Sequence, residues 1–313
     1  MLMSFLNLVL LVGFVGTLVA IYQSITGTSF IGSRAIYMGG GFSRVYHPNI
    51  VLIVFCTVYC ASLYVTMGLH RKLFWKYLLI PIYLFGIVVT FHRSIIGLTV
   101  FSIVLVLIFH SVIRRRQKSA GRIVILALVA LVLISVVFWS NVSSTNLGSL
   151  LLMRAETAVS ELQYNEGSFA GRMLLIGRTL LPVMNTSPFI GFGFNYNNDL
   201  SARFDPFALT IDAEYGNMFL MFGLVGFILF GWLYFRTTKY AILVYRSSDS
   251  SEMRALALAI IPMPFFFVII GFFSSILTYL PTLTTFVLIL ALLNLLVRFA
   301  EEDRKISLGK ISQ

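Results

Sequence analysis

The feature that most limits the fold of this chain is a series of long apolar segments separated by short polar ones. The hydrocarbon core of a bilayer is about 30 Å thick, and a helix needs about 20 apolar residues to cross it. The segments that meet or approach this length are residues 2–22, 50–69, 77–91, 95–113, 123–140, 215–235, 255–279 and 282–297. The sequence therefore predicts an all-α polytopic membrane protein with about eight transmembrane helices.

The amino-acid composition excludes the other broad classes of protein. Hydrophobic residues make up 58% of the chain and charged residues only 11%, whereas soluble domains carry about 25% charged residues. A soluble globular enzyme, a disordered chain and a disulfide scaffold are thereby excluded. The apolar segments are also unbroken, unlike the alternating segments of about ten residues in a transmembrane β-barrel, so a β-barrel is excluded as well.

The positive charge of the chain falls on one side of the predicted helices. With the N-terminus in the cytoplasm, 16 of the 23 Lys and Arg residues lie in inner segments together with five acidic residues, which accounts for the whole net charge of +11. The seven outer basic residues are balanced by seven acidic ones. This asymmetry follows the positive-inside rule. The partner that it indicates is the lipid bilayer, and no nucleic acid is needed to explain it.

Two outer segments are longer than ordinary connections, residues 23–49 and residues 141–212. Connections of this length are uncommon unless they have a function, so we expect the chemistry of the protein here. The domain organisation that follows is a single transmembrane domain over residues 1–313, with the large extracytoplasmic loop 141–212 inserted between helices five and six. Apolar residues at helical spacing predict short helices in that loop at residues 151–162 and 171–184.

The outer basic residues are all arginines, whereas all six lysines lie inside. Planar guanidinium groups suit a phosphate or diphosphate, because they bind its oxygens through two parallel hydrogen bonds. Arg93 stands between two apolar helices with no connector between them. Its side chain could reach the lipid headgroups or line a water-filled cleft that opens outward, and we favour the cleft.

Asp212 and Glu214 stand two positions apart where the sixth predicted helix begins. Acidic residues are favoured there by the helix dipole, and a carboxylate there could also act as a catalytic base. Both interpretations stay open at this point.

Metal ligands and cofactor motifs are not indicated. No His–Glu, paired-Cys or Asp-rich spacing typical of a metal site occurs, so we expect neither a metal nor another cofactor. Cys56 and Cys60 lie four positions apart inside an apolar segment, and we interpret them as core residues.

Four motifs share their order and their side of the membrane with one family. They are GGGFSRVYHPN at residues 39–49, RSIIG at residues 93–97, Gly171-Arg172 followed by Pro188, Gly191 and Gly193, and DAEY at residues 212–215 followed by Gly223 and Gly226. On these motifs the chain resembles the bacterial O-antigen ligase and polymerase superfamily, the Wzy-type membrane glycosyltransferases. The resemblance covers most of the chain from about residue 5 onward.

The resemblance implies a metal-independent, inverting glycosyltransferase at the outer face of the bacterial cytoplasmic membrane. Its donor would be an undecaprenyl-diphosphate-linked oligosaccharide. Arg93 and Arg172 would hold the diphosphate, with Arg178 as a weaker third donor, and Asp212 or Glu214 would serve as base toward the acceptor hydroxyl. Further substrate-binding residues would be Arg44, His47, Asn49, Gly191 and Gly193.

Two departures from the family pattern bear on the function. Members usually have ten or more helices, so this is either a short member or a chain whose start is internal. Ligases carry His where this chain has Asp212, whereas a carboxylate there is similar to polymerases. We therefore expect a polymerase of O-antigen, exopolysaccharide or capsule repeat units.

Other functions stay open beside the polymerase. They are a ligase that transfers glycan to a lipid A core or a protein acceptor, a polysaccharide transporter or flippase component, and a structural assembly partner. The resemblance also leaves open a chain-length regulator as an additional partner.

Overall fold

The computed structural model describes most of the predicted helices. It covers residues 2–28, 34–39, 42–46, 49–68, 70–90, 92–113, 184–193, 214–271 and 280–311. Within these ranges five helices are long and apolar enough to cross a membrane, and two shorter apolar helices accompany them. They coincide with seven of the eight predicted spans, so the helical membrane fold is confirmed. The predicted span 123–140 and the predicted loop helix 151–162 lie outside the described residues, as does nearly all of 171–184.

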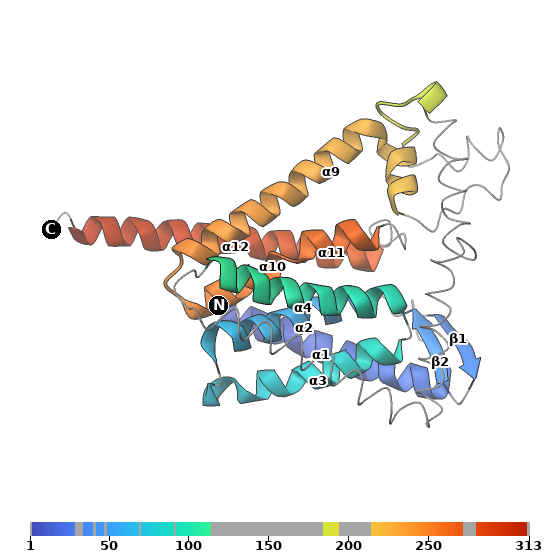
Figure 1. Ribbon diagram of the computed structural model, residues 1–313, viewed down its shortest axis with the longest axis horizontal. Helices are drawn as coiled ribbons and strands as arrows, with labels where there is room; N and C mark the ends of the chain where they lie inside the picture. The colour runs from blue at the N-terminus through green and yellow to red at the C-terminus, as the bar shows by residue number, and fades with distance from the viewer. Residues whose placement is uncertain are drawn as a thin grey trace.

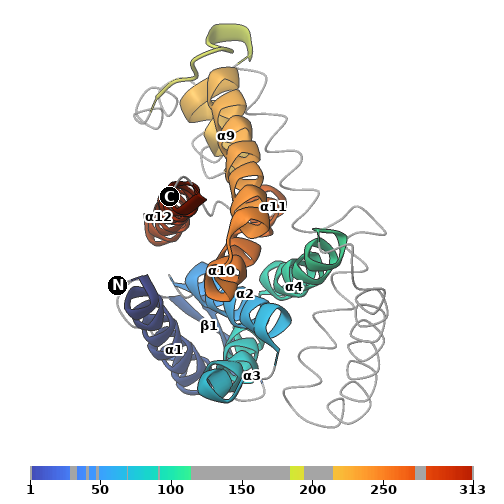
Figure 2. The ribbon, with the colours of Figure 1, turned by 90° about the vertical axis from the view of Figure 1, so that its left-hand side faces the viewer.

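The first four helices lie side by side, and each runs antiparallel to the one before it in the chain (Figure 1). They are α1 (Leu2–Thr26), α2 (Ile50–Met67), α3 (Phe74–Val89) and α4 (Arg93–Ile113), with a short 3₁₀ turn, η1 (Arg71–Leu73), before α3. Figure 2 looks along the bundle and shows α2 near its centre. Because α2 contacts α1, α3, α4, α10 and α12, every residue from Ile50 to Leu63 is buried.

Small residues let α1 approach its neighbours closely. A Cβ on Gly13 would lie 2.7 Å from Cys56 Sγ, and one on Gly86 would clash with Thr17. Small residues are typical of helix contacts in membranes, where dispersion between closely packed backbones replaces the hydrophobic effect. Between α3 and α1, the Tyr83 hydroxyl donates a 2.7 Å hydrogen bond to the Leu10 carbonyl.

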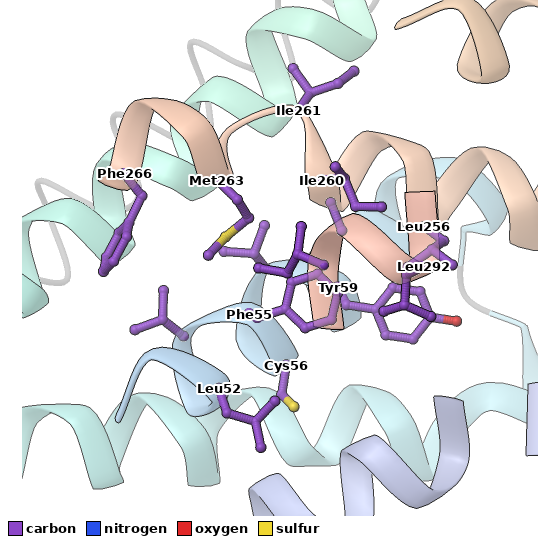
Figure 3. Close-up of a cluster of buried hydrophobic side chains, with 14 of the residues drawn as sticks. Leu52, Phe55, Cys56, Tyr59, Leu256, Ile260, Ile261, Met263, Phe266 and Leu292 are labelled. Carbon is purple, nitrogen blue, oxygen red and sulfur yellow. The ribbon is translucent and has the colours of Figure 1, made fainter. Parts of the chain in front are cut away.

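The C-terminal helices complete the bundle. They are α9 (Glu214–Ser247), α10 (Ser251–Ile260), α11 (Met263–Ile270) and α12 (Leu280–Ile311). α10 packs along α2, and side chains of α2, α10 and α12 form a buried cluster that includes Phe55, Cys56, Tyr59, Leu256, Ile260 and Leu292 (Figure 3). The prediction that Cys56 and Cys60 are core residues is confirmed, since both are free thiols and fully buried.

Helix boundaries differ from the predicted ones in two places. The predicted span 255–279 divides into α10 and α11 at Ile261-Pro262, because Pro262 has no N–H to continue the hydrogen-bond ladder. α9 continues to Ser247 rather than ending at 235, and the long part of this helix slants away from the bundle toward its N-terminal end in both views (Figures 1 and 2). The polar residues after Phe235 extend the helix, since Arg and Lys are good helix formers.

A short β-hairpin is an element that the sequence analysis did not predict. β1 (Arg34–Gly39) pairs antiparallel with β2 (Phe42–Tyr46), with Arg34 opposite Tyr46 and Gly39 opposite Phe42. They are the strands of the described residues. A signal for them is present, because β-branched and aromatic residues flank three glycines, a pattern typical of hairpins.

Apolar side chains cover much of the outer surface of the bundle. α1 exposes Leu8, Leu11, Val15 and Leu18 along one face, and α9 exposes a stripe made of Leu224, Val225, Ile228, Leu229, Trp232 and Phe235. Soluble proteins rarely expose apolar patches of this extent, whereas lipid covers them in a membrane protein. The fold is therefore that of a multi-pass membrane protein, and we call the α9 residues its lipid-facing stripe.

Candidate functional site

The helices that carry predicted site residues begin at the same end of the bundle. β2, which contains Arg44, contacts α1, and α2, α4 and α9 all begin at this same end (Figure 1). Asn49 immediately precedes α2, Arg93 is the first residue of α4, and Glu214 is the first residue of α9. The backbone thus places Arg44, Asn49, Arg93 and Glu214 at one end of the membrane domain.

A buried hydrogen bond fixes the junction from which Arg93 emerges. The Ser24 hydroxyl of α1 donates to the Val89 carbonyl of α3 at 2.8 Å, and the Thr90 hydroxyl donates to the Ile87 carbonyl at 2.7 Å. The first turn of α4 then closes with the Ile96 N–H donating to the His92 carbonyl at 3.0 Å. The backbone of Arg93 is therefore fixed between the hydrogen-bonded end of α3 and the first turn of α4.

Asn49 begins α2 through its backbone rather than through its side chain. The Ile53 N–H donates to the Asn49 carbonyl at 3.1 Å, but the Asn49 side chain makes no capping hydrogen bond. Asparagine is common at this position because its side chain usually caps the helix. That usual reason does not account for Asn49 here.

The described hydrogen bonds of the site are most numerous at a turn formed by residues 187–193, within the large outer loop 141–212. Ser187 closes this turn twice: its carbonyl accepts from the Gly191 N–H at 3.0 Å, and its hydroxyl donates to the Gly191 carbonyl at 2.9 Å. Gly191 and Gly193 have φ of 72° and 74°, a backbone region that only glycine adopts without strain. This explains why the motif needs glycine at both positions.

The turn is docked on a break in α9. Gly223 has φ 59° and ψ −156°, which divides α9 into a first segment, Glu214 to Phe222, and a second segment from Leu224 onward. The prediction that Gly223 lies inside a continuous helix over residues 215–235 is therefore wrong. Gly223 permits the break because its backbone geometry is essentially restricted to glycine.

Four backbone hydrogen bonds join the turn to the break. The Phe192 N–H donates to the Leu220 carbonyl at 2.7 Å, and the Gly193 N–H donates to the Met221 carbonyl at 3.0 Å. In the other direction, the Leu224 and Val225 N–H groups donate to the carbonyls of Pro188 and Phe189 at 2.9 and 3.1 Å. The turn thus satisfies polar groups that the broken helix cannot pair internally.

This docking links two of the motifs that the sequence analysis singled out. The turn ends the stretch that begins with Gly171-Arg172, and the first segment of α9 begins two residues after Asp212. Because the turn and the α9 break share four hydrogen bonds, residues 188–193 of the outer loop and residues 220–225 of α9 lie side by side. Neither the hydrogen bonds of Ser187 nor the break at Gly223 was predicted from the sequence, although both glycine motifs are visible in it.

Several predicted residues lie outside the described part of the chain. They are His47, Arg172, Arg178 and Asp212. For Arg44, Arg93 and Glu214 the structure gives the backbone position. Among the described residues no group of three or more His, Cys, Asp or Glu side chains is placed to hold a metal ion.

The comparison with known families agrees with this arrangement. The family model for O-antigen ligase, Wzy_C, matches residues 77–231, from the first turn of α3 to the second segment of α9. The match includes Arg93, the Pro188–Gly193 turn and the break at Gly223, whereas Arg44, His47 and Asn49 precede it. No curated protein matches the chain. The family match, on a multi-pass helical membrane fold, shows that the chain belongs to the O-antigen ligase/polymerase superfamily.

Proposed function

We propose that the protein is a polysaccharide polymerase that joins undecaprenyl-diphosphate-linked repeat units at the outer face of the bacterial cytoplasmic membrane. Its family has ligase- or polymerase-type function, and polymerase activity is the more specific function that we propose. The product would be O-antigen, exopolysaccharide or capsule. The proposed orientation follows the positive-inside rule, with the Arg93 end of the bundle outside.

The proposed reaction is a displacement at the anomeric carbon of the donor sugar. The acceptor hydroxyl oxygen forms the new glycosidic bond, while the bond from the anomeric carbon to the diphosphate breaks. The electron pair leaves with undecaprenyl diphosphate, and the hydroxyl proton passes to a carboxylate. Attack from the side opposite the leaving group inverts the anomeric centre.

Arg93 is the residue to which we assign the diphosphate most directly. It occupies the first position of a 21-residue helix, where the helix dipole disfavours a cation and favours an anion. Helix stability therefore does not explain an arginine there, whereas an anionic ligand shared by the guanidinium and the helix end would. Fixed guanidinium donors can stabilise charge on a leaving diphosphate without a metal. Arg172, and more weakly Arg178, are the proposed partners of Arg93.

The carboxylate that accepts the proton is assigned to Asp212 or Glu214. Glu214 begins α9, and the helix dipole alone would favour an acidic residue there. Asp212 stands two residues before the first residue of α9, where the effect of the helix dipole is weaker. We therefore assign the base first to Asp212 and treat Glu214 as the second candidate.

The observation that carries the proposal is the docking of the Pro188–Gly193 turn on the break in α9. The four hydrogen bonds join the turn at residues 187–193 to α9 near its start, at the end of the bundle where α4 begins. We propose that Arg172, earlier in the same loop, and Asp212, two residues before α9, meet there. A reaction that needs a cation for the diphosphate and a carboxylate for the acceptor requires such a convergence.

A ligase is the second candidate, because the family model that matches is described as O-antigen ligase. The two functions leave different products when the gene is deleted. Loss of a polymerase leaves single repeat units attached to the final acceptor, whereas loss of a ligase leaves no units attached.

The test of the proposed function is therefore a deletion followed by separation of the surface glycan by mass. Single repeat units on the acceptor, with the long ladder restored by the intact gene, are expected for a polymerase. Complete absence of attached units would instead support the ligase. An unchanged ladder would contradict both assignments.

A further inference from the structure

The described segment 184–193, which contains the turn that docks on α9, also carries an unusually exposed set of apolar side chains. Met184, Phe189 and Ile190 are 60%, 64% and 74% exposed. Because Phe189 is hydrogen-bonded through its backbone to Val225, this apolar tip, made of Met184, Phe189 and Ile190, adjoins the start of the lipid-facing stripe of α9. Water would be an unfavourable neighbour for such a surface.

The backbone at the break is satisfied in the manner that hydrocarbon requires. In water, the free carbonyls and N–H groups at a helix break can bond to solvent, so no docking segment is needed. Within a bilayer, irregular backbone is tolerated only when protein partners satisfy it. Here the carbonyls of Leu220 and Met221 and the N–H groups of Leu224 and Val225 are all bonded to the turn.

The charges farther along α9 set the depth of the break. Arg236, which packs against the rings of Trp232 and Tyr240, and Lys239 follow Gly223 by 13 and 16 residues. At 1.5 Å per residue these cations lie only about 20 and 24 Å along the helix from the break. The hydrocarbon core is about 30 Å thick, and the slant of α9 (Figure 1) shortens the depth further.

Cations avoid the hydrocarbon core and draw toward the nearest headgroups. When Arg236 and Lys239 are placed at the far boundary of the core, Gly223 lies several ångströms inside the near boundary. The turn is bonded directly to this break, so it shares that depth. The apolar tip then meets acyl chains rather than water.

We propose that residues 184–193 and the first segment of α9 form a re-entrant element, which enters the leaflet at the Arg93 end of the bundle and is covered there by bilayer acyl chains. In the proposed orientation this is the outer leaflet. The inference rests on exposure, backbone bonding and helix length, and it holds whether the protein is a polymerase or a ligase. It would fix the loop that contains Arg172 at a constant depth beside the headgroups.

The test is a depth measurement on the full-length protein in nanodiscs of a defined phospholipid. A nitroxide label is attached at Ile190→Cys, and its accessibility to oxygen is compared with its accessibility to a water-soluble nickel chelate. The two native cysteines are fully buried, so wild type should take up little label and serves as the labelling control. Met184→Cys provides a second probe of the same tip should Ile190→Cys fail to fold.

Two reference positions on the same chain calibrate the measurement. Ile228→Cys lies on the lipid-facing stripe of α9, and Asp249→Cys is at an exposed residue of the short connection between α9 and α10. An oxygen-to-nickel accessibility ratio nearer to that of the Ile228 label supports the re-entrant placement. A ratio nearer to that of the Asp249 label overturns it, and neither result depends on glycosyl transfer.

Discussion

Gly191 and Gly223 approach each other so closely that a Cβ on either glycine would lie 2.7 Å from the backbone nitrogen of the other. The backbones of two segments, centred on glycines 32 residues apart in the chain, are therefore in direct contact with no side chain between them. This contact is what allows the Pro188–Gly193 turn to reach the polar groups of the broken helix. It is also the part of the candidate site that substitution can test most sharply.

We expect Gly223→Ala to separate the turn from α9. The new methyl group would lie 2.5 Å from the carbonyl carbon and oxygen of Phe189, and the backbone geometry at this position would cost a further 1–3 kcal/mol, roughly. The expected result is a lower thermal midpoint in nanodiscs together with loss of long glycan.

Gly231→Ala is the matched control, because Gly231 lies in the same helix with no atom near its added Cβ. It should be neutral or stabilising by about 0.5–1 kcal/mol. Gly193→Ala separates conformation from clash, since Gly193 has a positive φ but open space, and it should fall between the two. Equal midpoints and equal activity for Gly223→Ala and Gly231→Ala would refute the proposed role of the contact.

Arg93→Ala should abolish polymer while the protein still inserts in the membrane. Loss of one donor to a developing oxyanion typically costs about 3–4 kcal/mol of barrier, a rate decrease of a hundredfold or more. Arg93→Lys should recover only part of the activity, because an ammonium group lacks the planar fork of a guanidinium. Arg246→Ala, an exposed arginine near the other end of α9, is the control and should leave polymer length unchanged. Normal amounts of long glycan from Arg93→Ala would remove Arg93 from the mechanism.

Asp212→Asn and Glu214→Gln should differ in severity, and the more damaging substitution identifies the base. Each replacement keeps the size of the side chain while removing the proton acceptor. We expect Asp212→Asn to be the more severe, because Glu214 has a sufficient structural reason to begin α9. The comparison is made on initial rates at equal amounts of folded protein. If both variants show the same mild decrease, neither carboxylate acts as the base.

Tyr83→Phe tests the packing that holds α1 against α3. The substitution removes the 2.7 Å hydrogen bond from the hydroxyl to the Leu10 carbonyl while the ring stays in place, and it should lower the free energy of unfolding by about 0.5–1.5 kcal/mol. Tyr240→Phe is the control, since its described contact is through the ring face to Arg236. Thermal midpoints in nanodiscs should separate the two variants, and equal midpoints would contradict the importance of this hydrogen bond.

Much of the fold could be predicted from the sequence because the bilayer imposes a simple rule on each span. A helix that crosses hydrocarbon must be apolar over about 20 residues, and segments such as α2 and α4 follow this rule closely. Local interruptions were harder to predict. Pro262 and Gly223 both interrupt helices, yet a glycine inside an apolar segment is also common in unbroken membrane helices. The break at Gly223 depends on a turn more than thirty residues earlier in the chain, which no local pattern reveals.

The candidate site could be predicted in part. The elements that begin at Arg93 and Glu214 and the glycine turn lie at one end of the bundle, and the roles assigned to these residues stay predictions. The hairpin of β1 and β2 was not predicted, because its strands span only six and five residues within the long segment 23–49, and strands this short give a weak pattern. The hydrogen bonds that Ser187 makes could not be predicted, since they depend on the three-dimensional closure of the turn.

The central claim is that Arg93 and a carboxylate near the start of α9 join lipid-linked repeat units without a further protein. The most direct measurement incubates the purified protein in nanodiscs with its undecaprenyl-diphosphate-linked oligosaccharide alone and resolves the products by mass. Wild type should give a ladder of lengthened lipid-linked glycans, and Arg93→Ala should leave the single unit unchanged. Wild type that leaves the single unit unchanged, or Arg93→Ala that gives the same ladder as wild type, would contradict the claim.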